Sequence, residues 1–313
     1  MRPKRIPTIP ALPTRVGSVH LRNPVLTASG TSGHGAELSS YVDLAGLGAV
    51  VTKSVSADPW PGNPAPRVHE ATAGMLNAVG LQGPGVAAWI RDDLPELLAA
   101  GATVVASIWG RSVEDYERAA AAMAEAPAQV VAVEVNLSCP NVEDRSGMFA
   151  HSADATEAAM AVTEACGRPR WAKLSPNSGD LVPIVDAAVR GGAEAVTLVN
   201  TVMGMAIDPV ARTYRLGNGG GGLSGPAMHP VAVRAVHDVA AARPEVPIVG
   251  AGGVADATGA AELLVAGASA VQVGTATFAD PHVPGLVAAG LVDWCRRQGL
   301  DDVNELIGAI HGD

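Results

Sequence analysis

The feature that most limits the fold is a short pattern that recurs along the chain. One or two small residues, mostly glycine and alanine, precede an apolar run at 46–54, 100–108, 191–201 and 266–275. Glycine just past a helix adopts the left-handed C-cap conformation, and valine-rich runs that are buried on both faces form parallel strands. Each copy therefore predicts the end of a helix followed by a buried strand.

Stretches with helical features separate these strand-like runs. One helix is expected from Ser112 up to Pro127, and another between Asp180 and Gly191, where apolar residues follow the i, i+3, i+4, i+7 spacing. The strand-like runs occupy 24–29, 49–54, 103–108, 130–138, 170–175, 195–200, 247–252 and 270–275. Eight strands that alternate with helices predict an α/β fold, a (β/α)8 TIM barrel rather than an open doubly wound sheet, in one domain over 1–313.

Two connections between predicted strands are much longer than the others. They lie at 57–85 and 202–226 and are rich in glycine, proline and asparagine. Both leave the C-terminal ends of strands, where barrel enzymes build their sites. We expect these inserted segments to fold over the C-terminal face of the barrel.

Composition argues against several classes of partner. The chain has 31 acidic and 21 basic side chains, a net charge of −10, and no long basic run to bind nucleic acid or an anionic membrane. The basic start is broken by prolines, and no uncharged apolar stretch is long enough for a membrane span. These features predict a soluble cytoplasmic protein.

The cysteines and histidines do not suggest a metal site. Three scattered cysteines form neither a disulfide framework nor a zinc motif, so Cys166 and Cys295 are expected to be buried small hydrophobic residues. The histidines, including His34, lack ligand spacing and are interpreted as solvated or capping residues. We therefore expect no metal.

Polar residues close the predicted strands on one face. Lys53 and Lys173 end the apolar runs VVTKS and RWAKLS, and a buried lysine costs several kcal/mol unless an anion or acceptor meets it. The two lysines therefore suggest an electron-rich ligand. The alternative is a surface salt bridge, which is less natural within such apolar runs.

Glycine-rich turns follow the last two predicted strands, and GLSGP precedes a helix. Backbone N–H groups at such turns bind phosphate, and barrels place phosphate sites after strands 7 and 8. The alternative is that these glycines serve only as turn residues.

Four asparagines offer a further signal, because side-chain amides that donate and accept could bind a planar ligand with carbonyl and ring N–H groups. The alternative is that these asparagines form turns, which suits Asn77 and Asn141 best.

Cys139 lies in VNLSCPN, between two asparagines. Free cysteines are usually buried, but the polar residues around Cys139 argue against an apolar environment. A role as a metal ligand is disfavoured because the sequence has no motif that would supply the other ligands. A thiol with a tuned pKa acts either as a general base or as a nucleophile. The residues alone leave these two roles open.

The chain resembles the class 1 dihydroorotate dehydrogenases, flavin mononucleotide (FMN) barrels of pyrimidine biosynthesis, over about residues 20–295. NTVMGMAID and GGLSGP are most similar to the 1B branch, whose catalytic subunit pairs with an iron–sulfur flavoprotein that passes electrons to NAD. The resemblance rests on NPVLTASGT, TKSVSADPWPGNPAPRV, GMLNAVGLQ, VNLSCPNV, KLSPN, VNTVMGMAID, GGLSGP, VGAGGV and AGASAVQVGTA.

The resemblance implies a role for each matching residue. Cys139 would be the general base that removes the C5 proton of dihydroorotate, and Lys173 would stabilise negative charge on the reduced flavin. The implied dihydroorotate and orotate pocket comprises Lys53, Asn77, Gly80, Leu81, Asn136, Asn141, Asn200 and Thr201. The implied FMN site comprises Ala28, Ser29, Gly30, Lys53, Ser54, Asn136, Lys173, Gly225, Gly252, Gly253, Gly274 and Thr275. The implied assembly is a homodimer with a partner subunit that carries FAD and an iron–sulfur cluster.

One departure from the family pattern bears on the substrate. Gly83 stands in GLQGPG where the family usually has asparagine, and Trp109 is unusually bulky for its place in ASIWG. A related dihydropyrimidine is therefore an alternative substrate for the same flavin barrel. A non-catalytic flavin-binding subunit is a second alternative, although a scaffold would need neither Cys139 nor Lys53.

Overall fold

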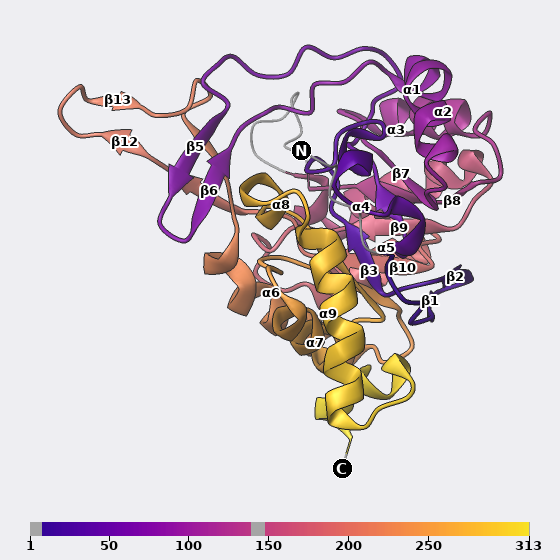
Figure 1. Cartoon of the computed structure of the whole chain (residues 1–313). Coiled ribbons are helices and arrows are strands. Elements are labelled where there is room, and N and C mark those ends of the chain that lie inside the picture. Colours follow the sequence, from indigo (N-terminus) through magenta and orange to yellow (C-terminus); the bar gives the residue numbers. More distant parts are fainter. Residues whose placement is uncertain (1–7, 139–147, 313) are drawn as a thin grey trace.

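The computed structural model describes residues 8–138 and 148–312, and its centre is a barrel of parallel strands (Figure 1). The strands lie in the order β3-β16-β15-β10-β9-β8-β7-β4, and a parallel bridge from Leu26 to Ala49 joins the two ends. They are β3 (Val25–Thr27), β4 (Val50–Val51), β7 (Val104–Ile108), β8 (Val130–Asn136), β9 (Arg170–Lys173), β10 (Ala195–Leu198), β15 (Ile248–Ala251) and β16 (Ala270–Val273). Each coincides with a predicted run, so the (β/α)8 barrel is confirmed.

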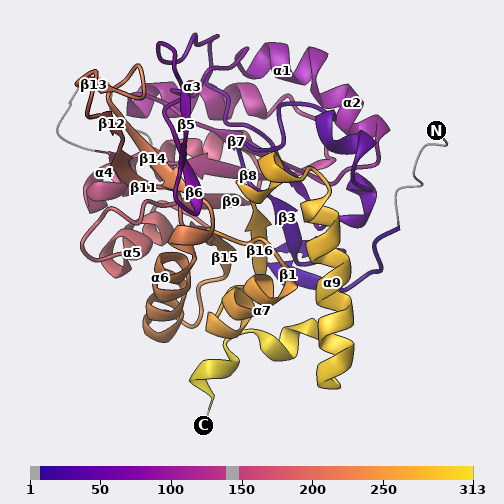
Figure 2. The same ribbon diagram turned by 60° about the vertical axis from the view of Figure 1, so that its left-hand side comes forward.

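Helices surround the barrel (Figure 2). Ser112 caps α3 as predicted, because its side chain accepts a hydrogen bond from the Asp115 amide at 3.2 Å. The α-helices are α1 (Val86–Asp92), α2 (Leu94–Ala99), α3 (Val113–Met123), α4 (Ala153–Val162), α5 (Val182–Arg190), α6 (His229–Ala242), α7 (Ala257–Ala266), α8 (Ala276–Ala279) and α9 (Val283–Gln298). Short 3-10 helices cover Glu37–Ser40, Leu44–Gly46, Phe149–His151, Thr163–Cys166, Pro226–Met228, Val303–Leu306 and Ala309–His311.

The core has an inner and an outer layer, and both are mainly aliphatic. The inner layer fills the barrel, where Leu26, Trp171 and Val249 are buried with Val16 and Val19 of an N-terminal hairpin. This hairpin, β1 (Thr14–Val16) and β2 (Val19–Leu21), therefore contributes to the barrel interior. The outer layer lies between strands and helices and includes Cys166 and Cys295, which are buried as predicted.

The two inserted segments pair with each other in one antiparallel sheet, in the order β11-β14-β6-β5. Residues Gly221 and Gly222 permit this pairing, because a Cβ at either position would collide with Asn77 or Thr201. A small ribbon extends from the sheet to the tip at the left of Figure 1. The strands are β5 (Val68–Ala71), β6 (Gly74–Asn77), β11 (Val202–Met205), β12 (Ile207–Asp208), β13 (Thr213–Tyr214) and β14 (Gly220–Ser224).

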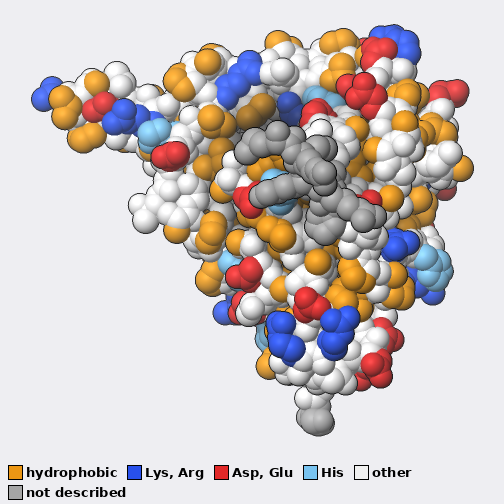
Figure 3. Space-filling model, viewed as in Figure 1, with side chains coloured by type: hydrophobic (Ala, Val, Ile, Leu, Met, Phe, Trp, Pro, Cys, Tyr) orange, Lys and Arg blue, Asp and Glu red, His pale blue; other side chains and the backbone are white. Residues whose placement is uncertain are grey.

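The ribbon formed by β12 and β13 projects from the surface in Figure 3 and carries both apolar and charged side chains. Ile207, Val210 and Tyr214 are exposed on it. Within residues 8–138 and 148–312, no helix combines the length and the apolar character that crossing a membrane requires.

Candidate active site

A cavity of about 650 Å³ opens between the C-terminal ends of the barrel strands and the inserted sheet. Its size is typical of cofactor and small-molecule sites. Cys139 and Asn141 lie outside the described residues. All the other predicted site residues line this cavity: Ala28, Ser29, Gly30, Lys53, Ser54, Asn77, Gly80, Leu81, Asn136, Lys173, Asn200, Thr201, Gly225, Gly252, Gly253, Gly274 and Thr275.

Three serine hydroxyls connect neighbouring strands below the cavity. Ser54 Oγ lies 3.1 Å from Ser29 Oγ and 2.8 Å from Ser107 Oγ. Asn136 Nδ2 donates to Ser54 Oγ at 3.2 Å, so the same hydroxyl also holds the amide at the end of β8. Because a hydroxyl donates once and accepts twice, these three contacts use the full hydrogen-bonding capacity of Ser54.

A second set of hydrogen bonds continues from Asn136 towards the inserted sheet. Ser138 donates its hydroxyl to Asn136 Oδ1 at 3.1 Å and accepts a hydrogen bond from Asn200 Nδ2 at 2.9 Å. Asn200 Oδ1 in turn accepts from the backbone amide of Thr201 at 2.8 Å. The two asparagines are therefore oriented by the protein. Ser138, the residue before Cys139, is held between them.

Lys53 follows β4 and is about half buried at the cavity wall. Its ammonium makes no hydrogen bond or ion pair with any residue that the structure describes. Burial lowers the pKa of Lys53, and the nearby positive charge of Arg67 lowers that pKa further. Such a cation gains from an anionic ligand, because the ligand replaces the water that burial removes.

Lys173 ends β9 and is held differently. Its side chain is 6% exposed, and Nζ lies 3.4 Å from Glu134 Oε1 and 3.0 Å from Gln272 Oε1. Glu134 on β8 provides a counter-charge, so the burial of Lys173 does not by itself indicate an external ligand. Among the two predicted lysines, only Lys53 lacks a protein partner within the described residues.

Glycine-rich turns form the opposite side of the cavity. Gly252 and Gly253 have φ angles of 138° and 69°, which L side chains rarely adopt. Gly30 also lines the cavity, and a Cβ built there would meet no atom within 4 Å. Backbone amides at these turns can approach a ligand closely because no side chain intervenes.

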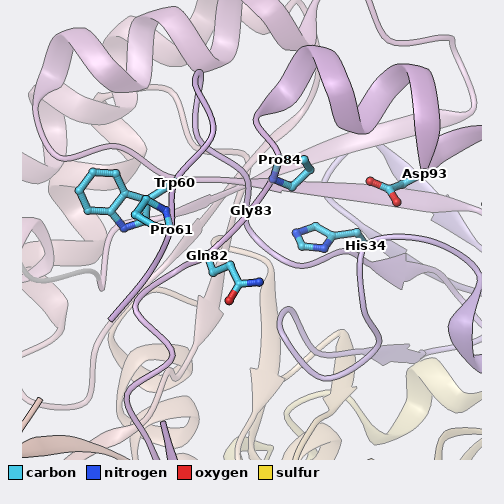
Figure 4. Close-up of a pocket in the computed structure, with 7 residues that line it drawn as sticks. All are labelled: His34, Trp60, Pro61, Gln82, Gly83, Pro84 and Asp93. Carbon is cyan, nitrogen blue, oxygen red and sulfur yellow. The ribbon is translucent and has the colours of Figure 1, made fainter. Parts of the chain in front are cut away.

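Gly83 does not border this cavity. It lies in a second hollow of about 610 Å³ with His34, Trp60, Pro61, Gln82, Pro84 and Asp93 (Figure 4). Gly83 pairs with Trp60 through two backbone hydrogen bonds of 2.9 and 3.0 Å. A Cβ at Gly83 would meet His34 Nε2 at 3.4 Å, which is ordinary contact. His34 lines both spaces, and the backbone oxygen of Ser54, another residue of the main cavity, would lie 3.7 Å from that Cβ.

His34 differs from the solvated or capping histidine that was expected. Its Nε2 atom is buried and has no hydrogen-bond partner among the described residues. Burial lowers the pKa of His34, the charge of Lys53 lowers it further, and Glu37 opposes both effects. His34 is therefore best accommodated as neutral imidazole beside Lys53.

Sequence reasoning missed part of the cavity floor. Glu134 and Gln272 surround Lys173, and Thr197 Oγ1 donates to Glu134 Oε2 at 2.9 Å. A signal was present, because a carboxylate in VVAVEVN and an amide in AVQVG each interrupt an apolar strand. A polar side chain in a fully buried strand requires partners inside the barrel.

The fold and cavity define a class: barrel enzymes that bind a ligand at the C-terminal face. A family model described as dihydroorotate dehydrogenase matches residues 11–294. The chain therefore belongs to the dihydroorotate dehydrogenase family. Membership makes it an oxidoreductase and implies a flavin cofactor.

Relatives cover nearly the whole chain. The dihydroorotate dehydrogenase B (NAD(+)) catalytic subunit of Desulforudis audaxviator is 48% identical over 297 residues, 95% of this chain and 96% of that protein. The protein of the same name from Geotalea daltonii is 46% identical over 302 residues, 96% of this chain and 98% of that protein.

Proposed function

We propose that this chain oxidises dihydroorotate to orotate in pyrimidine biosynthesis, with FMN as its cofactor. The observation that carries the proposal is the joint position of Lys53, Asn136 and Asn200 in one cavity with the glycine-rich turns. The named relatives support the same reaction. In this proposal the chain binds FMN as a single domain.

The cavity fits a flavin mononucleotide in three respects. Gly225, Gly252 and Gly253 present backbone without side chains, which suits a phosphate group. Gly30 leaves open space where another residue would project. Lys173 presents an ammonium with two of its three protons engaged by Glu134 and Gln272. When bound, the flavin supplies a two-electron acceptor.

The remaining polar groups suit dihydroorotate. Lys53, whose ammonium has no partner among the residues that the structure describes, offers its cation to the substrate carboxylate. The oriented amides of Asn77, Asn136 and Asn200 match ring carbonyl and N–H groups. In our proposal Cys139 takes the proton from C5, while the hydrogen at C6 leaves with two electrons. Ser138, fixed between Asn136 and Asn200, anchors the chain on the N-terminal side of Cys139.

The named relatives are catalytic subunits, which implies a partner that carries electrons onward. We propose that two copies of this chain form a homodimer and that a subunit with FAD and an iron–sulfur cluster receives the electrons. Size-exclusion chromatography with light scattering would test the dimer. Reduction of NAD by the chain with and without that subunit would test the electron path.

The absorbance spectrum of the purified, FMN-loaded chain without oxygen tests the reaction itself. Adding dihydroorotate should bleach the flavin band and yield orotate. Cys139→Ala should retain FMN and lower turnover by about two or more orders of magnitude, because a positioned base is lost. A bound flavin that dihydroorotate leaves oxidised would contradict the proposal and favour a non-catalytic flavin-binding subunit.

Gly83 is the sequence feature that favours the alternative substrate, a related dihydropyrimidine. Because Gly83 lies in the second hollow and not in the main cavity, its replacement should leave substrate preference unchanged. Gly83→Ala, assayed with dihydroorotate, dihydrouracil and dihydrothymine, tests this point. A parent chain that prefers either of the last two compounds would establish the alternative.

A further inference from the structure

Four side chains from four barrel strands form a closed network at the cavity floor. Lys173 and Gln272 line the cavity, and Glu134 and Thr197 lie fully buried behind them. Gln272 Oε1 accepts from Lys173 Nζ at 3.0 Å, while its Nε2 donates to Glu134 Oε2 at 2.6 Å. Gln272 comes from β16 and therefore reaches the others from a non-adjacent strand.

The donor pattern around Glu134 indicates that it is ionised. Lys173 approaches Oε1, while Thr197 and Gln272 both donate to Oε2. An ionised carboxylate only accepts hydrogen bonds, whereas a protonated carboxyl group would need an acceptor for its own proton. The amide of Gln272 bridges the two charges, with its oxygen towards the ammonium and its nitrogen towards the carboxylate.

We propose that Glu134 is a positioning residue that holds Lys173 at the flavin and neutralises most of its charge. This inference rests on the proposed FMN site. A lone lysine would strongly favour added negative charge on the ring, and the buried carboxylate behind it tempers that effect. The pair thereby sets how readily the bound flavin is reduced, while the three remaining protein contacts of Glu134 and Lys173 fix their geometry.

The test is the midpoint potential of FMN bound to the full chain, measured with a chemical reductant and a reference dye. Glu134→Gln should favour the reduced flavin about tenfold, an upward shift of about 30 mV for a two-electron couple. Lys173→Gln should shift the equilibrium about tenfold in the opposite direction. The double variant should return to within about threefold of the parent, because both charges are then removed.

Glu157→Gln is the matched control, since Glu157 lies on the surface beside Arg190 at 2.8 Å. Its potential should equal that of the parent. If Glu134→Gln does not fold, the double variant decides: a return towards the parent supports the proposal, and a potential equal to that of Lys173→Gln overturns it. An unchanged potential in a folded Glu134→Gln protein also overturns it.

The outcome is separable from that of the proposed reaction, because dihydroorotate is not used. FMN that is bound but not bleached by dihydroorotate contradicts the reaction alone. A midpoint potential of bound FMN that is the same in Glu134→Gln and in the parent contradicts only the role of Glu134.

Discussion

The floor and the wall of the cavity each carry one lysine, and the protein treats the two charges in opposite ways. Lys173 on the floor is buried and lies 3.4 Å from Glu134, whereas Lys53 on the wall is half buried and has no counter-charge within the described residues. The burial of a lysine at a strand end therefore indicates an external anion only where the protein does not itself supply one, and of these two lysines that is Lys53. Four measurements test this difference between the two lysines and their surroundings.

The largest expected effect is on stability. Lys173→Met should lower the free energy of unfolding of the chain without cofactor by about 3–5 kcal/mol, because Glu134 is left as an unpaired buried charge. Lys53→Met should change this free energy by less than about 1 kcal/mol, since Lys53 forms no ion pair with residues 8–138 or 148–312. Urea denaturation followed by circular dichroism compares the two. Equal losses would remove the distinction between floor and wall.

The next effect is on substrate affinity. Lys53→Met should raise the KM for dihydroorotate about a hundredfold, because the substrate carboxylate loses its cation. FMN affinity, measured by fluorescence of the free flavin, should change much less. A KM within threefold of the parent would show that the free charge of Lys53 serves another ligand.

The pH dependence of catalysis also tests whether the charge of Lys53 binds the substrate. Burial and the charge of Arg67 lower the pKa of Lys53, so this residue loses its proton at a lower pH than an ordinary lysine, whose pKa is about 10.4. The alkaline fall of kcat/KM should therefore begin below that pH. Lys53→Arg should move the fall to higher pH, because arginine keeps its charge. Coincident profiles would exclude Lys53 as the titrating group.

The smallest expected effect concerns His34, which shares the wall with Lys53. Its folded pKa lies below the ordinary 6.5, so the unfolded chain takes up the proton first as the pH falls through about 6.5. His34 therefore makes stability decrease on acidification. His34→Gln should lose less stability than the parent between pH 7 and pH 5 in urea titrations. A slope as steep as that of the parent would contradict this account.

The barrel could be predicted because its signals are local. Eight apolar runs and a cap at Ser112 mark elements that depend on neighbouring residues, and each was found where expected. Lys53, Asn136 and Asn200 could be assigned to one face because parallel strands end together.

Side-chain contacts between residues far apart in the sequence could not be predicted from such local signals. Gln272 meets Glu134 although 138 positions separate them, and Gly83 lies against His34 through the folding of an irregular loop. Neither spacing nor hydropathy specifies such contacts. For the same reason the sequence reveals neither the counter-charge of Lys173 nor the burial of His34 Nε2.

The sheet over the cavity has a consequence for the order in which the chain matures. Asn77 donates to Gly222 at 3.3 Å across 145 positions, and β6 pairs directly with β14. During synthesis, β6 in the first insert cannot pair fully with β14 until residue 224 has left the ribosome. Such non-local pairing forms slowly, since a long loop must close first. The substrate cavity is therefore finished late, after most of the barrel strands already exist.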